Sequence, residues 1–286
     1  MYQEKLLIIS IKRLKDFGEE EGRDRYRTRR ADITGTFLIK DLLDDAKEKF
    51  QNPNIDERER KMSKIRVRLL LHIFADTYAH ENFSGFHGWE NFSYLSGVTD
   101  NYDDDKDITN DYNRDFYYGI YSIGHANVGN ATDDTFISLD IKMSENSTQR
   151  EKENYTLTFS RSNTQVFCDV AKQIFRYICS LNGKEENEVE AIWRDVHEHI
   201  KRGFKCHSTE VNELAAQWRE ICPNINYRYD KKDYCDNQLI PLLFDENVTL
   251  EEKLEENNIA GIYKTAQDDF FYYNLVAKEI RDKIIE

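Results

Sequence analysis

Helix-breaking residues are scarce in this chain, which has only 3 prolines and 12 glycines among 286 residues. Because both residue types interrupt helices, their scarcity favours a mainly α fold. Hydrophobic residues make up 39% of the chain and aromatic residues 13%, which supports a packed core. The sequence contains no linker rich in Pro, Gly or Ser that would mark a domain boundary. We therefore predict a single helical domain over residues 1–286, a multi-helix bundle with a small β-hairpin insertion.

Net positive charge is also lacking, since the formal net charge is −14. This disfavours a broad nucleic-acid surface, because contacts to phosphates depend on clustered Lys and Arg. A small ligand that contains phosphate stays compatible with this charge where a bound cation inverts the local field. The sequence has no apolar run of the ~20 residues that a transmembrane helix needs, and its N-terminus lacks the pattern of a signal peptide. The five cysteines include no CxxC pair, which favours reduced thiols in a cytoplasmic protein.

One apolar stretch carries three polar groups at helical spacing. In residues 69–85, LLLHIFADTYAHENFSG, the side chains of His72, Asp76 and His80 are four residues apart and share one face of a helix. Apolar residues cover most other directions, which is typical of a buried helix. We therefore expect two imidazoles and a carboxylate inside the protein. Such groups need partners, and the two common solutions are a metal ion or a closed hydrogen-bond network.

Other helices are predicted from capping residues and apolar periodicity. Asp56 opens the long helix that carries the three polar groups, and Gly85 is its expected stop. The other predicted helices cover about residues 32–50, 163–181, 188–201, 208–221 and 265–285.

Residues 86–123 contain many aromatic and acidic residues and few aliphatic ones. We interpret this segment as a long acidic aromatic loop. Its aspartates lack the alternation of oxygens, the central Gly and the terminal Glu of an EF-hand loop, so a solvated loop is the simpler interpretation. His87 follows the long helix closely, and it lies either on the surface or back in the histidine pocket.

A second polar focus lies at residues 124–134, GHANVGNATDD. Small residues around His125 permit close approach of the backbone, and Asp133 and Asp134 form a carboxylate pair. After it, apolar and polar residues alternate over residues 137–143 and again over 155–159. This pattern predicts the β-hairpin insertion, at about residues 136–160.

Both polar foci and two further motifs carry a family resemblance. The motifs are HIFADTYAH followed by NFSGFH (residues 72–80 and 82–87), Gly124 and His125 with Thr132 and Asp133, RSN (161–163) at a helix start, and FFYYNLVAKEIRD (270–282). Through them the chain, from about residue 25 onwards, resembles an uncharacterised group of bacterial proteins, the domain-of-unknown-function 6765 family. The resemblance implies an all-helical, metal-dependent hydrolase that is distantly similar to zinc-dependent phospholipase C and P1-type nucleases.

The chain departs from the family pattern in three respects. Family members usually carry an additional N-terminal helical section with its own histidine and aspartates, and this chain starts after the point where it should lie. The family proline before the aspartate of the second motif is Thr132 here, and the usual histidine near the end is Asn274. Some expected ligands therefore lack a counterpart. The resemblance implies either a non-catalytic relative or a protein that works beside a partner chain supplying the missing elements.

The leading hypothesis is a metal-dependent hydrolase that acts on a phosphoester, in a small molecule or a lipid. Imidazole and carboxylate groups suit a divalent metal, zinc most of all, which activates water for hydrolysis. The expected metal ligands are His72, Asp76, His80, His125 and Asp133. Asp76 and Asp133 are each a ligand or the general base. His87 orients the substrate or a metal ligand.

The rival hypothesis is a non-catalytic binding or assembly protein in which the same cluster is structural. A closed metal site or a buried polar network would then fix the helices. The acidic aromatic loop would meet a protein partner, because aromatic residues are enriched in interface cores.

Overall fold

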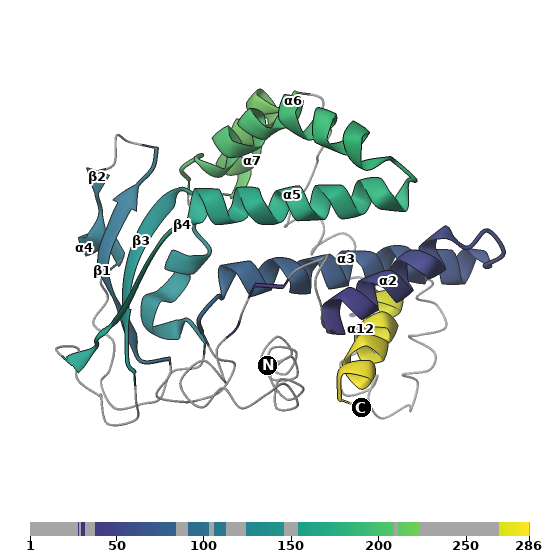
Figure 1. The fold of residues 1–286 in the computed structure, drawn as a ribbon, viewed down its shortest axis with the longest axis horizontal. Helices are drawn as coiled ribbons and strands as arrows, with labels where there is room; N and C mark the ends of the chain where they lie inside the picture. Colours follow the sequence, from purple (N-terminus) through teal and green to yellow (C-terminus); the bar gives the residue numbers. More distant parts are fainter. Residues whose placement is uncertain are drawn as a thin grey trace, which may run out of the picture.

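The computed structural model describes residues 28, 30–31, 38–83, 91–102, 106–112, 124–145, 154–208, 211–223 and 269–285 (Figure 1). These residues form α-helices and one antiparallel sheet, with most of them in helices, which confirms the predicted mainly α chain. The sheet lies at one end of the long helix α3 (Glu57–Ala79), and helices α2 (Leu38–Gln51) and α12 (Asp269–Ile285) pack near its other end (Figure 1). Helix α5 (Asn163–Leu181) runs alongside α3.

Helix α3 begins where the sequence predicts, because the Asp56 side chain accepts a hydrogen bond of 2.7 Å from the Glu59 backbone N–H. Its predicted end at Gly85 is wrong. The helix ends at Ala79, and His80 is the capping residue, with φ −99° and ψ 21°. Two residues later Asn82 takes a φ of 73°, which turns the chain away from the helix axis.

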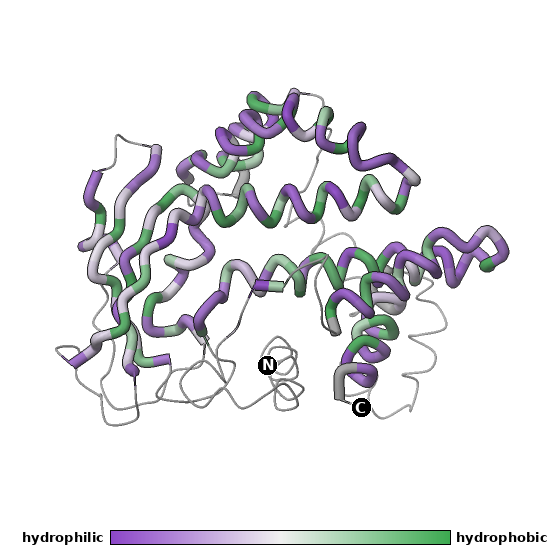
Figure 2. The backbone as a smooth tube through the Cα atoms, viewed as in Figure 1, coloured by the Kyte–Doolittle hydropathy of each residue, from purple (hydrophilic) through white to green (hydrophobic). Residues whose placement is uncertain are grey.

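A helical core joins α3 to α2, α5 and α12. In Figure 2, hydrophobic and hydrophilic positions alternate along these helices with helical periodicity, so that each helix buries one side. Helix α6 (Glu186–Phe204) covers α5, and α7 (Val211–Ile221) packs on α6. The Trp218 ring of α7 occupies the space that a side chain at Gly203 would need. The most deeply buried apolar members of the core are Leu43, Ala46, Leu70, Phe74 and Val276.

The sheet has four strands in the order β2-β1-β3-β4, all antiparallel. Strands β3 (Ile137–Met143) and β4 (Leu157–Ser162) form the pair that the alternating residues predict. They are the inner and outer strands of a larger sheet, however, and not a separate hairpin. Strand β4 leads directly into α5, so residues 161–163 form the corner between sheet and helix.

The prediction of a loop over residues 86–123 is wrong for most of the part of that segment that the structure describes, residues 91–102 and 106–112. It contains β1 (Ser93–Asp100), β2 (Lys106–Asp107) and the short helix α4 (Thr109–Tyr112). The register shifts between Leu95 and Gly97, so Leu95 and Val98 are both buried although they are three positions apart in the strand. This bulge breaks the two-residue alternation by which a strand is recognised in sequence.

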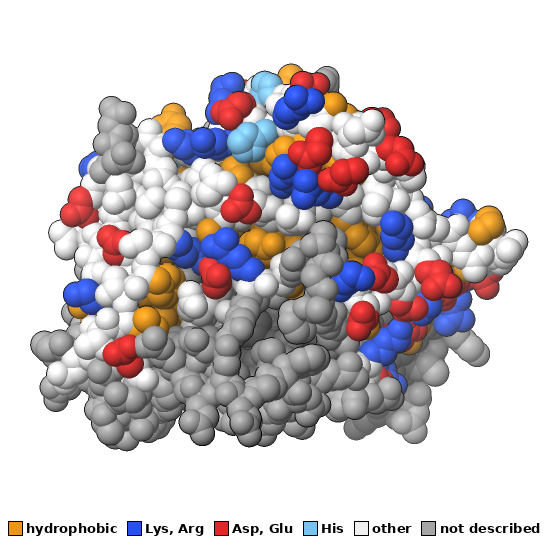
Figure 3. Space-filling model, viewed as in Figure 1, with side chains coloured by type: hydrophobic (Ala, Val, Ile, Leu, Met, Phe, Trp, Pro, Cys, Tyr) orange, Lys and Arg blue, Asp and Glu red, His pale blue; other side chains and the backbone are white. Residues whose placement is uncertain are grey.

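A second hydrophobic cluster is formed by the sheet and by the residue Phe83, which follows the end of α3. Phe83, which is fully buried, packs there with residues of the strands and of the segment before β3. His80 therefore lies where the helical core ends and the sheet core begins. None of the described helices combines the length and the hydrophobicity needed to span a bilayer. On the face drawn in Figure 3, Lys and Arg side chains lie beside Asp and Glu side chains.

Candidate functional site

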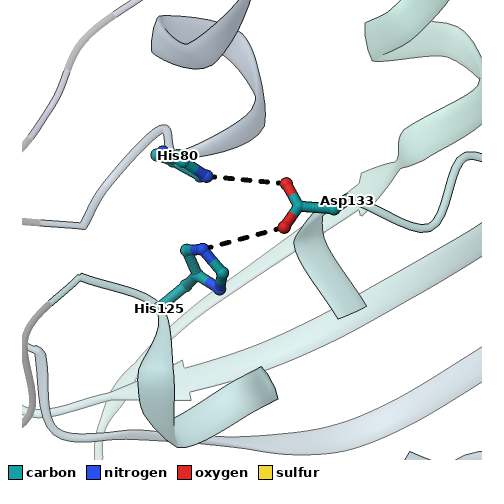
Figure 4. A group of neighbouring side chains, drawn as sticks. All are labelled: His80, His125 and Asp133. Carbon is teal, nitrogen blue, oxygen red and sulfur yellow. Dashed lines mark ion pairs between the residues drawn. The ribbon is translucent and has the colours of Figure 1, made fainter. Parts of the chain in front are cut away.

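Two of the predicted polar foci meet at the end of α3. The short 3-10 segment η4 (Ala126–Thr132) has His125 immediately before it and Asp133 immediately after it. His80, from the turn after α3, faces the same carboxylate (Figure 4). The His80 Nε2 lies 3.5 Å from one oxygen of Asp133, and the His125 Nε2 lies 3.8 Å from the other. One ligand atom from each residue lies within 4.8 Å of the other two.

The orientation of His125 is set by a bend in η4. Gly129 has φ 58° and ψ −138°, a backbone conformation that residues other than glycine rarely adopt. The bend places the Gly129 carbonyl oxygen 2.6 Å from His125 Nδ1. A carbonyl only accepts hydrogen bonds, so Nδ1 carries the proton, and in the neutral ring Nε2 is a bare acceptor that faces Asp133.

The spacing of these atoms is too long for hydrogen bonds and suits a shared cation. N–H···O bonds are about 2.7–3.2 Å long. Ligand atoms around one tetrahedral metal lie about 3.3 Å apart when each bond is about 2.0–2.1 Å. The rings of His80 and His125 are stacked with centroids 4.5 Å apart and an angle of 28° between their planes. Two positively charged rings would repel each other at this distance, whereas two neutral rings that share a metal would not.

The electrostatic setting of Asp133 favours its ionised form. Burial alone raises the pKa of this carboxyl, but the close contact with His80 and the fields of Arg161 and of the two histidines in their protonated forms outweigh it. The pKa of Asp133 therefore lies below its ordinary value of 3.8. The carboxylate is ready to bind a cation at neutral pH.

Asp76 lies beside this cluster, in a less favourable setting for its charge. Burial raises the pKa of Asp76 above 3.8, the nearby charge of Asp133 raises it further, and the fields of His72, His80 and His125 oppose both effects. Its oxygen Oδ2 lies 3.7 Å from His72 Nε2. Within the described ranges, Asp76 and His72 form a pair of their own next to the three converging residues.

The prediction that both imidazoles of the α3 face are buried is wrong for His72. Its side chain is 59% exposed, against 20% for His80 and 24% for His125. His72 lies on a face of α3 that is turned to solvent, since Arg68, one turn before it, is also exposed, whereas His80 is the capping residue and faces Asp133. His87 lies outside the described residues.

The carboxylate pair of Asp133 and Asp134 is divided between two surroundings. Asp134 accepts a hydrogen bond of 2.7 Å from the Tyr112 hydroxyl of α4. Burial raises the pKa of Asp134, which the hydrogen bond from Tyr112 only partly offsets. The Asp134 carboxylate is thus turned toward α4, and of the two carboxylates only that of Asp133 faces His80 and His125.

A comparison with family models assigns the chain to a protein family. The model described as a family of unknown function (DUF6765) matches residues 23–286. The chain belongs to the DUF6765 family. No curated protein and no solved structure matched it.

In this DUF6765 chain the RSN motif at residues 161–163 holds the site together. The Arg161 guanidinium is buried and donates to the carbonyl oxygens of Tyr78 (3.2 Å), Ala79 (3.0 Å) and Thr132 (3.4 Å), and to Asn163 Oδ1 (2.7 Å). Sequence reasoning placed Arg161 and Asn163 in the resemblance but gave them no role. The sequence shows only that these two polar residues follow an alternating strand. It does not show which backbone carbonyls Arg161 binds.

A short N-terminal segment holds the other side of the turn that carries His80. The Thr28 backbone N–H donates to the Phe83 carbonyl, and the Asn82 N–H donates to the Thr28 carbonyl, both at 2.8 Å. Arg30 forms an ion pair of 2.9 Å with Glu81. The turn is therefore fixed from two sides, which is the support that a binding site on irregular backbone requires.

Proposed function

We propose that this protein is a metal-dependent hydrolase of phosphoesters, with His80, His125 and Asp133 as its metal ligands. One observation carries the proposal. The hydrogen bond to Gly129 leaves the bare Nε2 of His125 facing the Asp133 carboxylate at 3.8 Å. Two acceptors that face each other need a proton or a cation between them, and one divalent cation would satisfy both histidines and the carboxylate.

The ligand set fits a catalytic metal. Two imidazoles and one carboxylate suit zinc, and three protein ligands leave a fourth position for water or substrate. A bound Zn²⁺ lowers the pKa of its water to about 7. With a metal bound, Asp76, which is partly buried beside the cluster, would act as the general base, and His72 lies 3.7 Å from Asp76 on the solvent side. Alternatively, His72 and Asp76 are themselves metal ligands.

The charge of the surroundings favours an anionic substrate. Burial lowers the pKa of Arg161 to about 10, so the guanidinium stays protonated at neutral pH. It forms no ion pair within the described part of the chain, because its acceptors are carbonyl and amide oxygens. A divalent ion, the carboxylates of Asp76 and Asp133 and one guanidinium together still carry a net positive charge, which attracts a phosphoester anion.

Metal content and hydrolysis test this proposal directly. The protein is stripped with EDTA, reloaded with Zn²⁺, and examined by elemental analysis and with bis(p-nitrophenyl) phosphate. We expect bound zinc and metal-dependent hydrolysis. His125→Ala and Asp133→Asn should weaken zinc binding by more than about 100-fold, because even residues behind the ligands contribute 10–100-fold. His197→Ala, at a partly exposed position of α6 where the ring contacts Trp193 and lies beside Glu198, is the matched control and should change neither property. A folded wild-type chain that binds no divalent metal contradicts the proposal.

A second candidate function is a binding or assembly protein in which the metal is structural. The observation that favours it is the position of the cluster, where α3, η4 and the corner before α5 are hydrogen-bonded together. In that case zinc would raise the melting temperature, and no phosphoester would be hydrolysed. His72→Ala and Asp76→Ala separate the two functions, because in an enzyme they reduce hydrolysis while the fold is retained. In a scaffold these substitutions affect stability alone, and a protein partner would be sought by co-purification.

A further inference from the structure

Arg161 binds the backbone on both sides of the candidate metal site. Its acceptors Tyr78 and Ala79 end α3, where the last carbonyls of a helix have no partner within the helix. Its acceptor Thr132 ends η4. The residue after Ala79 is His80, and the residue after Thr132 is Asp133. One planar guanidinium thus joins the two backbone segments from which these two ligands project.

Asn163 completes this arrangement from the first turn of α5. Its side-chain amide donates to the carbonyl oxygens of Ala131 and Asp134, both at 2.7 Å, and its Oδ1 accepts from Arg161 Nε. The backbone is therefore held on each side of Asp133. Asn163 is fully buried, so no water competes for these bonds.

We propose that Arg161, together with Asn163, is the positioning residue of the metal site and sets the separation between His80 and Asp133. This inference rests on the proposed metal site. Neither side chain touches the metal. They act by fixing the backbone that carries two of the three ligands, so that the ligand atoms are spaced for a cation before it binds.

The same chain offers a matched control in Arg66. Arg66 is also buried, but its guanidinium contacts the carboxylates of Glu59 (3.3 Å) and Glu279 (2.6 Å), and so joins α3 to α12. Arg66 lies far along α3 from His80. Losing either arginine costs stability, and only the loss of Arg161 should change the geometry of the metal site.

The test compares Arg161→Lys with Arg66→Lys in the full-length protein. A lysine keeps the charge but has no planar fork to reach carbonyls in two directions. We expect Arg161→Lys to weaken Zn²⁺ binding by about 10–100-fold in a chelator competition assay. With Co²⁺ in place of zinc, its visible absorption bands should change in position or intensity, which a general loss of stability would not cause. Arg66→Lys should retain the wild-type affinity and Co²⁺ spectrum.

Other results of these experiments would contradict the positioning role of Arg161 or the metal site itself. If Arg161→Lys folds and binds Zn²⁺ and Co²⁺ as the wild type does, the positioning role is wrong while the metal site stands. If Arg161→Lys does not fold, Asn163→Ala replaces it, with the same expected weakening and the same consequence if affinity is unchanged. A wild-type protein that binds neither ion overturns the proposed function itself, and the inference with it.

Discussion

The two ends of α3 are held in place by different kinds of interaction. In its first half, apolar side chains pack against α2 and α12, and the buried Arg66 is neutralised by two glutamates. At its last turn, the buried Arg161 binds neutral backbone carbonyls. The first region joins regular helices, whose backbone groups are already paired. The second joins a helix end to a bent segment, where the carbonyls need partners from side chains.

This difference suggests how stability and function are divided in the molecule. The helical core removes a large apolar area from water, which is the main source of folding free energy. The joint between α3, η4 and the corner before α5 buries polar groups whose hydrogen bonds add little net stability but fix positions closely. Substitutions in the core should therefore change stability without changing metal affinity, whereas substitutions that break a hydrogen bond of the joint should change metal affinity as well.

The largest effect on stability is expected from Leu43→Ala. Leu43 is 1% exposed on α2, in the helical core and away from the joint. The lost contacts and the resulting cavity should lower the free energy of unfolding by about 2–5 kcal/mol in urea titrations. Ile178→Ala, at a position that is 44% exposed on α5, should cost far less. Zinc affinity should be unchanged in both variants, and a clear loss in Leu43→Ala would show that core and joint are coupled.

The next largest effect is expected from Gly129→Ala, with Gly183→Ala as its control, because both glycines have a positive φ. Gly129 (φ 58°) and Gly183 (φ 69°) both have open space where a Cβ would stand. Alanine should cost about 1–2 kcal/mol of backbone strain at Gly183, and about 1–3 kcal/mol at Gly129, whose ψ of −138° lies outside the left-handed helical region. Only Gly129 supplies the carbonyl that orients His125, so Gly129→Ala should also weaken zinc binding, whereas Gly183→Ala should not. Isothermal titration with Zn²⁺ checks this, and equal affinities in the two variants would contradict the proposed tautomer of His125.

These comparisons also show what the sequence could reveal. The spacing of His72, Asp76 and His80 predicts a common helical face, and the small residues around His125 indicate a close approach of the backbone. The meeting of His80 with Asp133 depends on where α3 ends, and that end is set by the turn at Asn82 and by hydrogen bonds from residues distant in sequence. Long-range hydrogen bonds of this kind leave no periodic pattern, so the sequence does not predict them.

The sheet illustrates the same limit. Strands β3 and β4 alternate regularly and are predicted, while β1 is not, because its bulge at Leu95–Gly97 places a glycine against the Asp140 side chain. A Cβ at Gly97 would lie 2.9 Å from Asp140 Oδ2. The requirement for glycine comes from the neighbouring strand, and local sequence carries no information about it.

A smaller effect is expected from Asp76→Asn, and it depends on pH. Because the folded-state pKa of Asp76 is raised, the folded protein binds more protons than the unfolded chain just above pH 3.8, and wild-type stability falls as pH rises through that window. The neutral variant avoids this loss. In EDTA its melting temperature should exceed that of the wild type at pH 7, and the difference should shrink as pH falls toward 4. Asp44→Asn, on the exposed surface of α2 and outside the cluster, is the control for the general effect of removing one carboxylate.

The same variant distinguishes the two roles of Asp76. If Asp76 is the general base, Asp76→Asn keeps its zinc affinity and loses about 100-fold or more in kcat. If it is a ligand, zinc affinity falls as well. A kcat equal to that of the wild type would remove Asp76 from the mechanism.

The smallest effect concerns two buried threonines near the end of α3, only one of which has hydrogen-bond partners for its hydroxyl. Thr77 on α3 uses its hydroxyl twice, donating to the Phe74 carbonyl (2.7 Å) and accepting from the Ala31 N–H (2.9 Å). The hydroxyl of Thr132 is buried and finds no partner in the described part of the chain. Thr77→Val should therefore lower the free energy of unfolding by about 0.5–1.5 kcal/mol, and Thr132→Val should raise it by up to about 1 kcal/mol, because an unpaired buried hydroxyl is itself a cost.

The sign of the Thr132 effect reports on the joint. Thr132 precedes Asp133, and its carbonyl is held by Arg161, so a valine there keeps the backbone in place and removes only the hydroxyl. Stabilisation of the metal-free protein, measured by urea unfolding in EDTA, would show that this hydroxyl has no structural partner. Destabilisation would contradict that conclusion. Where Thr132→Val stabilises the protein and zinc affinity is unchanged, the carbonyl alone is the part of Thr132 that the site requires, as the arrangement around Arg161 implies.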